Sequence, residues 1–394
     1  MTDATHTKSR LISVIIPSYN SQETISETLD SLLSQTHECW EAIIIDGASS
    51  DDTASIIQTY TLRDSRFSLI QLEENMGVSA ARNKGLELSA GTYLNFLDSD
   101  DYLYPDTFSL MLKHMEQQND CSGVYGNHQL LFVDGSKKQV QAEKEADITF
   151  DSLCLGNKFY SNFAILFKKT SLADAGHFDE EIIAGEDWDL WIRLYRAGHW
   201  FVHMNENTGC YRVRPDSLSR DHFAAWKGHS DVIDKIFSRD RRCPRPLGKY
   251  IEGPDSSNKS KVYKNLNNYH LSGCIASNDA ESIKRILSMG HRMEMPKLNA
   301  HDLAHGVISR ISQHPEGMAL LDSQWPAFSK VIYNTVSCIA SACSDRLFIR
   351  DFFLAMLSIS PKSANHRKML ISALRHGAYL QPRKVMKLFI RSFC

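Results

Sequence analysis

Long apolar runs are missing from this 394-residue sequence. No stretch approaches the roughly 18 apolar residues that a membrane-spanning helix needs. The first apolar run, at 11–16, is too short for the core of a secretory signal, and residues 1–10 before it are polar. We therefore expect neither a secretory leader nor a spanning helix, and we expect a cytoplasmic protein.

The sequence also lacks paired cysteines and any large excess of one charge. Its nine cysteines include no C-x-x-C pair, and an odd number in a long chain argues against a disulfide framework. The formal net charge of -3 provides no general attraction for nucleic acid, so we expect no nucleic-acid partner. The composition, 42% hydrophobic and 23% charged, is that of a globular protein able to bury a core.

Strand and helix patterns alternate through residues 11–105. Short β-branched apolar runs at 11–16 and 42–45 are typical of strands buried on both faces, and Pro17 is expected to end the first. A helical pattern over 78–89 lies between two later strand patterns. Repeated strand-helix-strand units predict an α/β fold, with a Rossmann-like, mostly parallel sheet and helices on both faces.

Residues 120–225 have a mixed pattern. Short strands are predicted at 123–125, 163–167 and 200–204, and a helix is predicted to include 189–196. We assign this region to the same α/β domain as the residues before it.

Punctuation and periodicity divide the chain after a polar tail, 1–10. The α/β domain is predicted over 11–240. Closely spaced Pro and Gly residues mark 241–260 as a linker. Helical patterns, including a stripe of Ile283, Ile286 and Leu287, dominate the remainder, so 261–394 is predicted to be a mainly α-helical C-terminal domain.

The end of that domain, 362–394, is basic and contains no Asp or Glu. A basic amphipathic helix can lie on an anionic membrane surface. An ordinary helix would instead turn the same charges toward solvent or an acidic partner. The first interpretation predicts peripheral contact with the inner face of the plasma membrane.

The sharpest chemical signal is the turn Asp98-Ser99-Asp100-Asp101, which follows a predicted strand. Three carboxylates in four residues repel one another, and burying them is costly unless a cation neutralises them. Carboxylate oxygens suit Mg²⁺ or Mn²⁺, which commonly bridge protein carboxylates and substrate phosphates. A solvated acidic turn would carry the same residues, but ligands of such sheets bind beyond the carboxyl ends of the strands, which favours a metal site.

Two neighbouring segments could contact a nucleotide. Pro17-Ser18-Tyr19-Asn20 follows the first strand, and Asp46 ends the second. An aromatic ring can stack on a base, and a carboxylate can accept from a base N–H or a ribose hydroxyl. Turn chemistry is the alternative explanation, because Asn20 followed by Glu23 has the pattern of a helix-capping box.

Glu186 and Asp187 form an acidic pair between Gly185 and Trp188. An acid among apolar groups can serve as a general base with a tuned pKa. Acids are also favoured at the start of a helix by its dipole, and the two roles are compatible.

A basic segment contains Tyr211, Arg212 and Arg214. Arginines pair bidentately with phosphate oxygens, which makes this segment a candidate phosphate-binding loop. A basic surface loop would have the same composition.

Together these segments resemble the family-2 inverting glycosyltransferases, which have the GT-A fold. The resemblance covers about residues 10–225 and leaves the C-terminal third outside. The motifs that carry it are SVIIPSYN from Ser13, DGASSDDT from Asp46, ARNKG from Ala81, LDSDD from Leu97 and GED from Gly185.

The resemblance implies a role for each matching residue. The residues implied to bind the nucleotide sugar are Pro17, Ser18, Tyr19, Asn20, Asp46, Arg82, Asp98, Ser99, Tyr211, Arg212 and Arg214. The implied ligands of Mn²⁺ or Mg²⁺ are Asp100, Asp98 and Asp101. Asp187 is the implied catalytic base, and Glu186 is the second candidate.

Two positions depart from the family pattern. Many relatives have a second acid after the second strand, where this sequence has Gly47. Asp46 would therefore be the only acid of this pair that contacts the nucleotide base. Many relatives also have a histidine two residues after the loop arginine. Here that position is Arg214, which cannot ligate a metal cation and is expected to contact phosphate.

The resemblance implies transfer of a sugar from a nucleotide-diphosphate sugar, with UDP-sugars favoured, to the hydroxyl of a saccharide or lipid-linked saccharide. Cell-surface polysaccharide or glycolipid assembly is the expected setting. A nucleotidyltransferase of related fold is one alternative, but it usually needs a Gly-rich basic loop, which 17–22 does not provide. A catalytically inactive sugar-nucleotide-binding module is the other, and the intact Asp98, Asp100 and Asp187 argue against it.

Overall fold

The computed structural model groups the chain into two compact units. Unit 1 contains residues 1–218 and 231–258, and unit 2 contains 219–230 and 259–394. The predicted linker therefore falls largely within unit 1. The residues that the structure describes are 10–118, 120–214, 221–276, 279–290, 302–304, 306, 307 and 352. The basic segment 362–394, predicted to contact a membrane, lies outside them.

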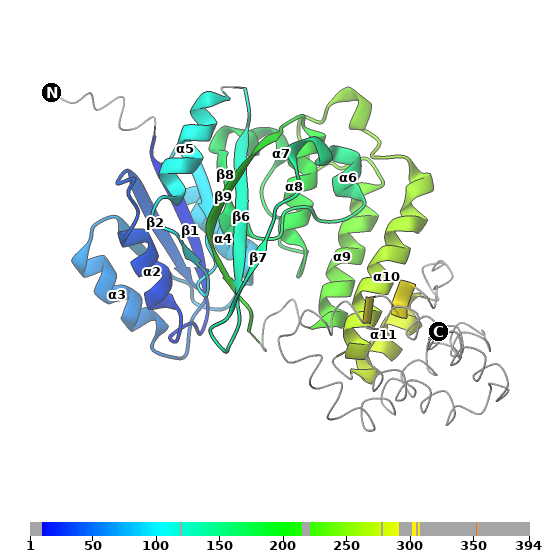
Figure 1. The fold of residues 1–394 in the computed structure, drawn as a ribbon, viewed down its shortest axis with the longest axis horizontal. Coiled ribbons are helices and arrows are strands. Elements are labelled where there is room, and N and C mark those ends of the chain that lie inside the picture. The colour runs from blue at the N-terminus through cyan, green and yellow to red at the C-terminus, as the bar shows by residue number, and fades with distance from the viewer. Residues whose placement is uncertain are drawn as a thin grey trace, which may run out of the picture. The chain divides into compact units, whose positions relative to one another are not determined.

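Unit 1 is built on a mixed sheet of nine strands (Figure 1). Its order is β3-β2-β1-β4-β8-β6-β9-β5, with β7 paired to β6. β1 pairs in parallel with both β2 and β4, and β2 pairs in parallel with β3. The strands are β1 (Ile12–Ser18), β2 (Trp40–Asp46), β3 (Phe67–Gln71), β4 (Tyr93–Phe96), β5 (Tyr102–Leu103), β6 (Gly123–Leu131), β7 (Lys137–Val140), β8 (Ile165–Lys168) and β9 (Phe201–Arg212).

Helices cover both faces of the parallel half of this sheet. Along β2, Ala42 and Ile44 belong to the main hydrophobic core with helices α2 and α3, whereas Ile43 and Ile45 pack with Ala81 of α4. This alternation is what a strand buried on both faces requires, and it confirms the predicted α/β class. The helices of unit 1 are α2 (Ile25–Leu33), α3 (Thr53–Arg63), α4 (Val78–Leu88), α5 (Thr107–Gln117), α6 (Phe150–Cys154), α7 (Leu172–Ala175) and α8 (Glu186–Arg196).

The carboxyl ends of β1, β2 and β4 meet at one edge of the sheet. Ser18 is the register partner of Asp46, and the N–H of Leu97 donates to the carbonyl of Ile15 at 3.1 Å. Helix α4 approaches β1 closely at Gly85, where an added Cβ would lie 2.4 Å from Cγ2 of Ile15. Glycine at this position lets the helix sit against the strand ends.

Two local predictions near the end of β1 were wrong. Pro17 lies within β1 and does not end it, because pairing with β4 ends two residues earlier, at Ile15, and proline is tolerated at a strand end. The predicted capping box is absent: α2 starts from Thr24, and Asn20 instead adopts φ 49° and accepts the N–H of Ser50 at 2.9 Å. Asparagine tolerates this left-handed conformation, which turns the chain after the strand.

The strands β6 and β9 are much longer than the predicted 123–125 and 200–204. They pair with each other in parallel, with register shifts near Tyr125 and Asn127. Their second halves are rich in polar residues, so apolar periodicity does not reveal them. Long-range pairing, rather than local pattern, extends these strands.

Unit 2 contains the first residues of α9 (His222–Ile236) together with α10 (Lys259–Ala276) and α11 (Ala280–Gly290). Nε1 of Trp226 donates to Oδ1 of Asn267 at 2.8 Å, which joins α9 to α10. The predicted stripe on α11, formed by Ile283 and its neighbours, is buried. Within the described part of the chain, no helix combines the length and apolar character needed to cross a membrane.

Candidate active site

Arg82 of α4 connects two of the predicted site segments. Its side chain is 2% exposed, its Nη2 donates to Oδ1 of Asp98 at 2.8 Å, and its Nη1 donates to Oε1 of Glu186 at 2.6 Å. Burial by itself lowers the pKa of Arg82, but the two carboxylates outweigh burial and raise that pKa above its ordinary value. One buried cation therefore joins the turn after β4 to the start of α8.

The acidic turn after β4 is crowded with negative charge. The side chain of Asp98 is 32% exposed, so part of this carboxylate faces outward. Burial and the neighbouring charge of Asp98 raise the pKa of Asp100 to about 6. Asp101 differs from both, because it is buried and its Oδ1 accepts the N–H of Arg212 at 2.9 Å.

Hydroxyl groups hold the backbone of this turn in place. Oγ1 of Thr24 donates to the carbonyl of Ser99 at 2.9 Å, and Oγ1 of Thr28 donates to the carbonyl of Asp101 at 2.7 Å. The hydroxyls of Ser21 and Ser99 lie 2.7 Å apart. Sequence reasoning missed these threonines, although two threonines four residues apart at a buried helix face were a usable signal.

The residues predicted to face the nucleotide lie around the ends of β1 and β2. Asp46 is fully buried and accepts the N–H of Ser49 at 3.2 Å and its hydroxyl at 2.5 Å, so it stabilises its own loop. Asn20 joins this loop through its N–H, which donates to Oγ of Ser49 at 2.9 Å. Ser18 is buried, and among the described residues its Oγ has no hydrogen-bond partner. The ring of Tyr19 is half exposed.

The acidic pair begins helix α8. Gly185 precedes it with φ 83°, a conformation that favours glycine. Glu186 is bound to Arg82, whereas Oδ1 of Asp187 accepts the N–H of Trp188 at 2.6 Å. Burial and the charge of Glu186 raise the pKa of Asp187 to about 7, against the opposing effect of Arg82. The two acids therefore differ. Glu186 forms an ion pair with Arg82, whereas Asp187 has a pKa close to neutral pH.

The end of β9 returns to the acidic turn. Nε of Arg212 donates to the carbonyl of Asp100 at 3.0 Å, and its Nη2 binds the carboxylate of Glu27. Arg214 carries a positive charge that lowers the pKa of Asp100. Tyr211 packs against the main hydrophobic core. The structure thus brings both predicted arginines to the acidic turn.

In the part of the chain that the structure describes, no group of three or more His, Cys, Asp or Glu side chains is arranged to hold a metal ion. Within the turn, the carboxylate of Asp98 is partly exposed and binds Arg82, whereas the carboxylate of Asp101 accepts the N–H of Arg212. Magnesium commonly takes only one or two protein carboxylates and completes its coordination with substrate phosphates and water.

Comparison with known proteins identifies the family. The family model described as Glycosyl transferase family 2 matches residues 13–175. A protein of Bacillus subtilis (strain 168), named putative teichuronic acid biosynthesis glycosyltransferase TuaG, is 33% identical over 217 residues, which are 55% of this chain and 84% of that protein. This chain belongs to glycosyl transferase family 2. The family predicted from the sequence motifs is confirmed.

Two other comparisons agree with this result. The Escherichia coli protein WfgD, named as a beta-1,3-glucosyltransferase, is 29% identical over 259 residues, which are 65% of this chain and 91% of that protein. The crystal structure of S. aureus TarS 1-349 has a TM-score of 0.54 and 17% identity, and covers 94% of this chain and 93% of its own. The protein is therefore a glycosyltransferase with the GT-A fold, while the roles of its individual residues stay predictions.

Proposed function

We propose that this glycosyltransferase transfers a sugar from a nucleotide-diphosphate sugar to an acceptor hydroxyl with inversion, and that Asp187 is its general base. The observation that carries the proposal is the buried guanidinium of Arg82. Because it binds both Asp98 and Glu186, the acidic turn and the start of α8 border one site. A donor held at the turn would then lie beside the acids of α8.

Asp187 is a better base than Glu186. The carboxylate of Glu186 is engaged by the Arg82 guanidinium at 2.6 Å, so it already has a partner within the protein. The pKa of Asp187 is raised to about 7, near the value at which a general base works best. Both observations support Asp187 in the role.

The proposed reaction is one in-line displacement. The acceptor oxygen attacks the anomeric carbon as Asp187 removes its proton. The bond from the anomeric carbon to the acceptor oxygen forms while the bond to the β-phosphate oxygen breaks. The nucleoside diphosphate leaves with the electron pair from the opposite face, so the configuration inverts and no covalent sugar intermediate forms.

We place Mn²⁺ or Mg²⁺ at Asp98 and Asp100. The raised pKa of Asp100 supports this placement, because a carboxylate crowded by a neighbouring negative charge gains from a bound cation. A bound divalent ion would neutralise charge on the departing diphosphate. Asp101 fits less well as a ligand, because it is buried and bound to the N–H of Arg212. It anchors the 211–214 segment instead.

The donor side of the site suits a nucleotide. The exposed ring of Tyr19 can stack on a base, the hydroxyl of Ser18 can bind a ribose or base, and buried Asp46 holds the loop that flanks both. Arg212 and Arg214 would contact the diphosphate, because both lie beside the acidic turn. Arg82 is engaged by two carboxylates, which favours a role in joining the site over direct contact with the donor.

We further propose a UDP-sugar donor and a lipid-linked saccharide acceptor, in cell-surface polysaccharide or glycolipid assembly at the inner face of the plasma membrane. The name of the E. coli relative WfgD specifies UDP-Glc and a GlcNAc-diphosphoundecaprenol acceptor. A relative from Campylobacter jejuni is named a GalNAc(5)-diNAcBac-PP-undecaprenol beta-1,3-glucosyltransferase. These names support the proposed substrate classes.

The test is a panel of UDP-sugars with a polyprenyl-diphosphate saccharide acceptor, with and without Mn²⁺, measured as UDP release and product formation. Asp187→Asn should lower kcat by roughly 10³-fold, because a general base contributes about 10²–10⁴. UDP affinity should stay within about twofold, because the substitution removes no donor contact. Glu186→Gln should lose less activity than Asp187→Asn.

Other outcomes separate the alternatives. Unchanged turnover in Asp187→Asn would remove Asp187 from the base role. Pyrophosphate release from a nucleoside triphosphate and a sugar phosphate would identify a nucleotidyltransferase. UDP-sugar binding without turnover for any donor would identify an inactive binding module.

A further inference from the structure

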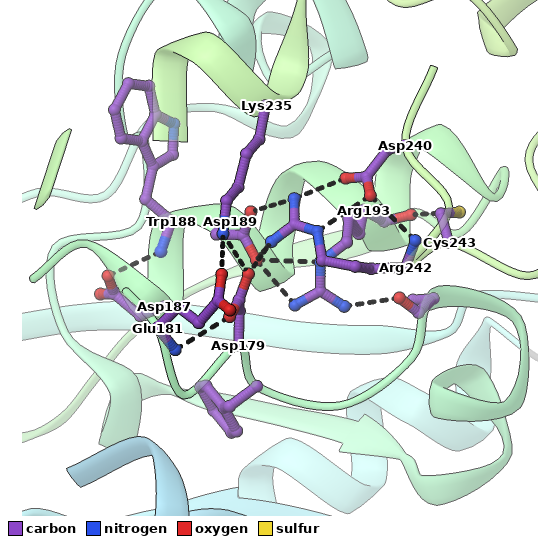
Figure 2. A network of polar contacts seen from close by, with 12 residues as sticks. Asp179, Glu181, Asp187, Trp188, Asp189, Arg193, Lys235, Asp240, Arg242 and Cys243 are labelled. Atoms are coloured by element: carbon purple, nitrogen blue, oxygen red, sulfur yellow. Dashed lines mark hydrogen bonds and ion pairs between the residues drawn. The ribbon is translucent and has the colours of Figure 1, made fainter. Parts of the chain in front are cut away.

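A cluster of charged side chains holds α8 on the side that faces 235–243. Figure 2 shows the cluster beside Asp187, with the side chains of Arg193 and Arg242 directed toward the acids. Its members are Asp179, Asp189, Arg193, Lys235, Asp240 and Arg242. The three acids and three bases pair with one another, so the cluster joins several segments through opposite charges.

Arg242 is the centre of this cluster. Its Nη1 donates to Oδ2 of Asp179 at 2.6 Å, and its Nη2 lies 2.9 Å from Oδ1 of Asp189 and 2.6 Å from Oδ2 of Asp240. Burial lowers the pKa of Arg242, but the carboxylates of Asp240 and Asp189 outweigh burial and raise that pKa above its ordinary value. One planar guanidinium therefore bridges the loop before α8, α8 itself and the 240–243 segment.

Asp179 connects Arg242 to the loop before α8. Its Oδ1 accepts the N–H of Glu181 at 3.0 Å, and its carbonyl accepts the N–H of Ile182 at 3.2 Å. Asn83 of α4 holds the same loop by accepting the N–H of Phe178 at 3.0 Å and donating to its carbonyl at 3.0 Å. The loop that leads to Asp187 is thus fixed between α4 and Arg242.

Asp189 connects Arg242 to helix α8. It is fully buried, two residues after Asp187, and its Oδ2 lies 2.8 Å from Nη2 of Arg193. Nη1 of Arg193 donates in turn to the carbonyl of Ala175 at 2.5 Å. The first turns of α8 are therefore held to α7 through Arg193 and to the 240–243 segment through Arg242. Arg242 is the group that contacts both the loop before α8 and the helix.

Such a cluster is suited to holding the segments that it joins in one orientation. Buried ion pairs add little net stability, because desolvation offsets their attraction, but their geometry can define one arrangement of the chain. A reacting group displaced by about 1 Å can lower a rate by about 10²-fold. We propose that Arg242 is a positioning residue, which sets the place of Asp187 by bridging Asp179 and Asp189. The inference rests on the proposed role of Asp187 as the base.

The experiment compares variants of the full chain. Arg242→Gln removes the bridge, Arg242→Lys keeps the charge but not the planar fork, and Asp179→Asn removes the charge that the loop presents to both Arg242 and Lys235. Arg245→Gln is the matched control, because Arg245 lies three residues away, is 76% exposed and pairs with Asp174 at 3.1 Å. Each is measured for kcat, for UDP affinity and for the fraction folded at the assay temperature.

Arg242→Gln should lower kcat by about 30-fold while UDP affinity stays within about twofold. Arg242→Lys should recover part of the loss, and Asp179→Asn should show a smaller loss of kcat in the same direction. The fold-loss of kcat in the double variant Asp179→Asn, Arg242→Gln should be smaller than the product of the two separate fold-losses, because both changes break the contact between Asp179 and Arg242. Arg245→Gln should match the unsubstituted protein.

The proposal is overturned if folded Arg242→Gln keeps its kcat, or if kcat and UDP affinity fall in equal proportion, as a general loosening would produce. If Arg242→Gln does not fold, Asp179→Asn decides by the same criteria. Asp187→Asn is run alongside. Normal turnover in that variant rejects the proposed function, whereas an inactive Asp187→Asn with a normal Arg242→Gln rejects only the positioning role.

Discussion

Two regions of unit 1 supply the two halves of the candidate site, and they are organised differently. In the donor side, residues 12–101, the chemical groups lie at neighbouring strand ends and are held by nearby turns and helix hydroxyls. In the base side, residues 176–196 and 231–247, Asp187 lies at a helix start fixed by ion pairs with a segment more than fifty positions later. Sheet register orders the first region, and long-range charge orders the second.

Arg82 is the point at which the two regions join. It belongs to the donor side by sequence, yet one of its two carboxylate partners, Glu186, belongs to the base side. The difference teaches that pairing between neighbouring strands is enough to place the donor side. The base side also needs contacts with residues that come much later in the sequence.

Removing the junction should have the largest effect. Arg82→Met leaves Asp98 and Glu186 without their shared cation, so we expect a loss of about 3 kcal/mol in the free energy of unfolding and no detectable transfer. Urea denaturation and the UDP-release assay measure the two effects. Lys84→Met is the control on the same helix, because its ion pair with Glu87 is exposed and should contribute less than about 0.5 kcal/mol. Equal stability of the two variants would contradict the junction.

The acidic turn gives the next largest effect and sharpens the account of the donor side. Asp100→Asn should lower transfer by about 100-fold and raise the Mn²⁺ concentration needed for activity, because it removes a proposed ligand. Asp101→Asn should keep most activity, because an amide oxygen still accepts the N–H of Arg212. A Mn²⁺ titration of both variants measures this. Similar losses and similar titrations would mean that Asp101 also binds the ion.

The smallest predicted effect concerns pH and the base side. Asp187 acts only when deprotonated, and its pKa is raised to about 7, so activity should fall as pH drops through 7. At pH 6 the rate should be about one tenth of its plateau. Glu186→Gln should move this limb to lower pH, because it removes a neighbouring negative charge and leaves Arg82 less neutralised.

Profiles of kcat against pH for the unsubstituted protein and for Glu186→Gln measure the shift of the acidic limb. UDP binding over the same pH range separates that shift from titration of Asp100. A limb that stays in place in Glu186→Gln would show that another group controls the rate.

Much of the donor side could be predicted from the sequence. The runs that became β1 and β2 are apolar and β-branched, so their burial and the placement of Asp46 followed from composition and length. The errors were local. Pro17 and Asn20 carry strong signals for a strand end and a helix cap. Pairing with β2 overrode the first signal, and hydrogen bonds of Asn20 with Ser49 and Ser50 overrode the second.

The base side could be predicted only in part. The acids at the start of α8 were found, because their motif is local. The function of Arg242 was not found, because the Pro and Gly residues around it are typical of a linker and no periodicity relates it to Asp179 or Asp189. The polar second halves of β6 and β9 were missed for the same reason, since only their partners define them as strands.

The contacts of α4 with the loop before α8 limit how enzymes of this kind can be recombined. Arg82 and Asn83 are adjacent, and they bind Glu186 and Phe178, which lie about a hundred positions later. A hybrid whose crossover falls between α4 and α8, made to exchange acceptor preference, would separate these partners unless both parents share them. Exchanges that carry this small set of residues from one parent should give active hybrids more often than exchanges chosen by sequence length.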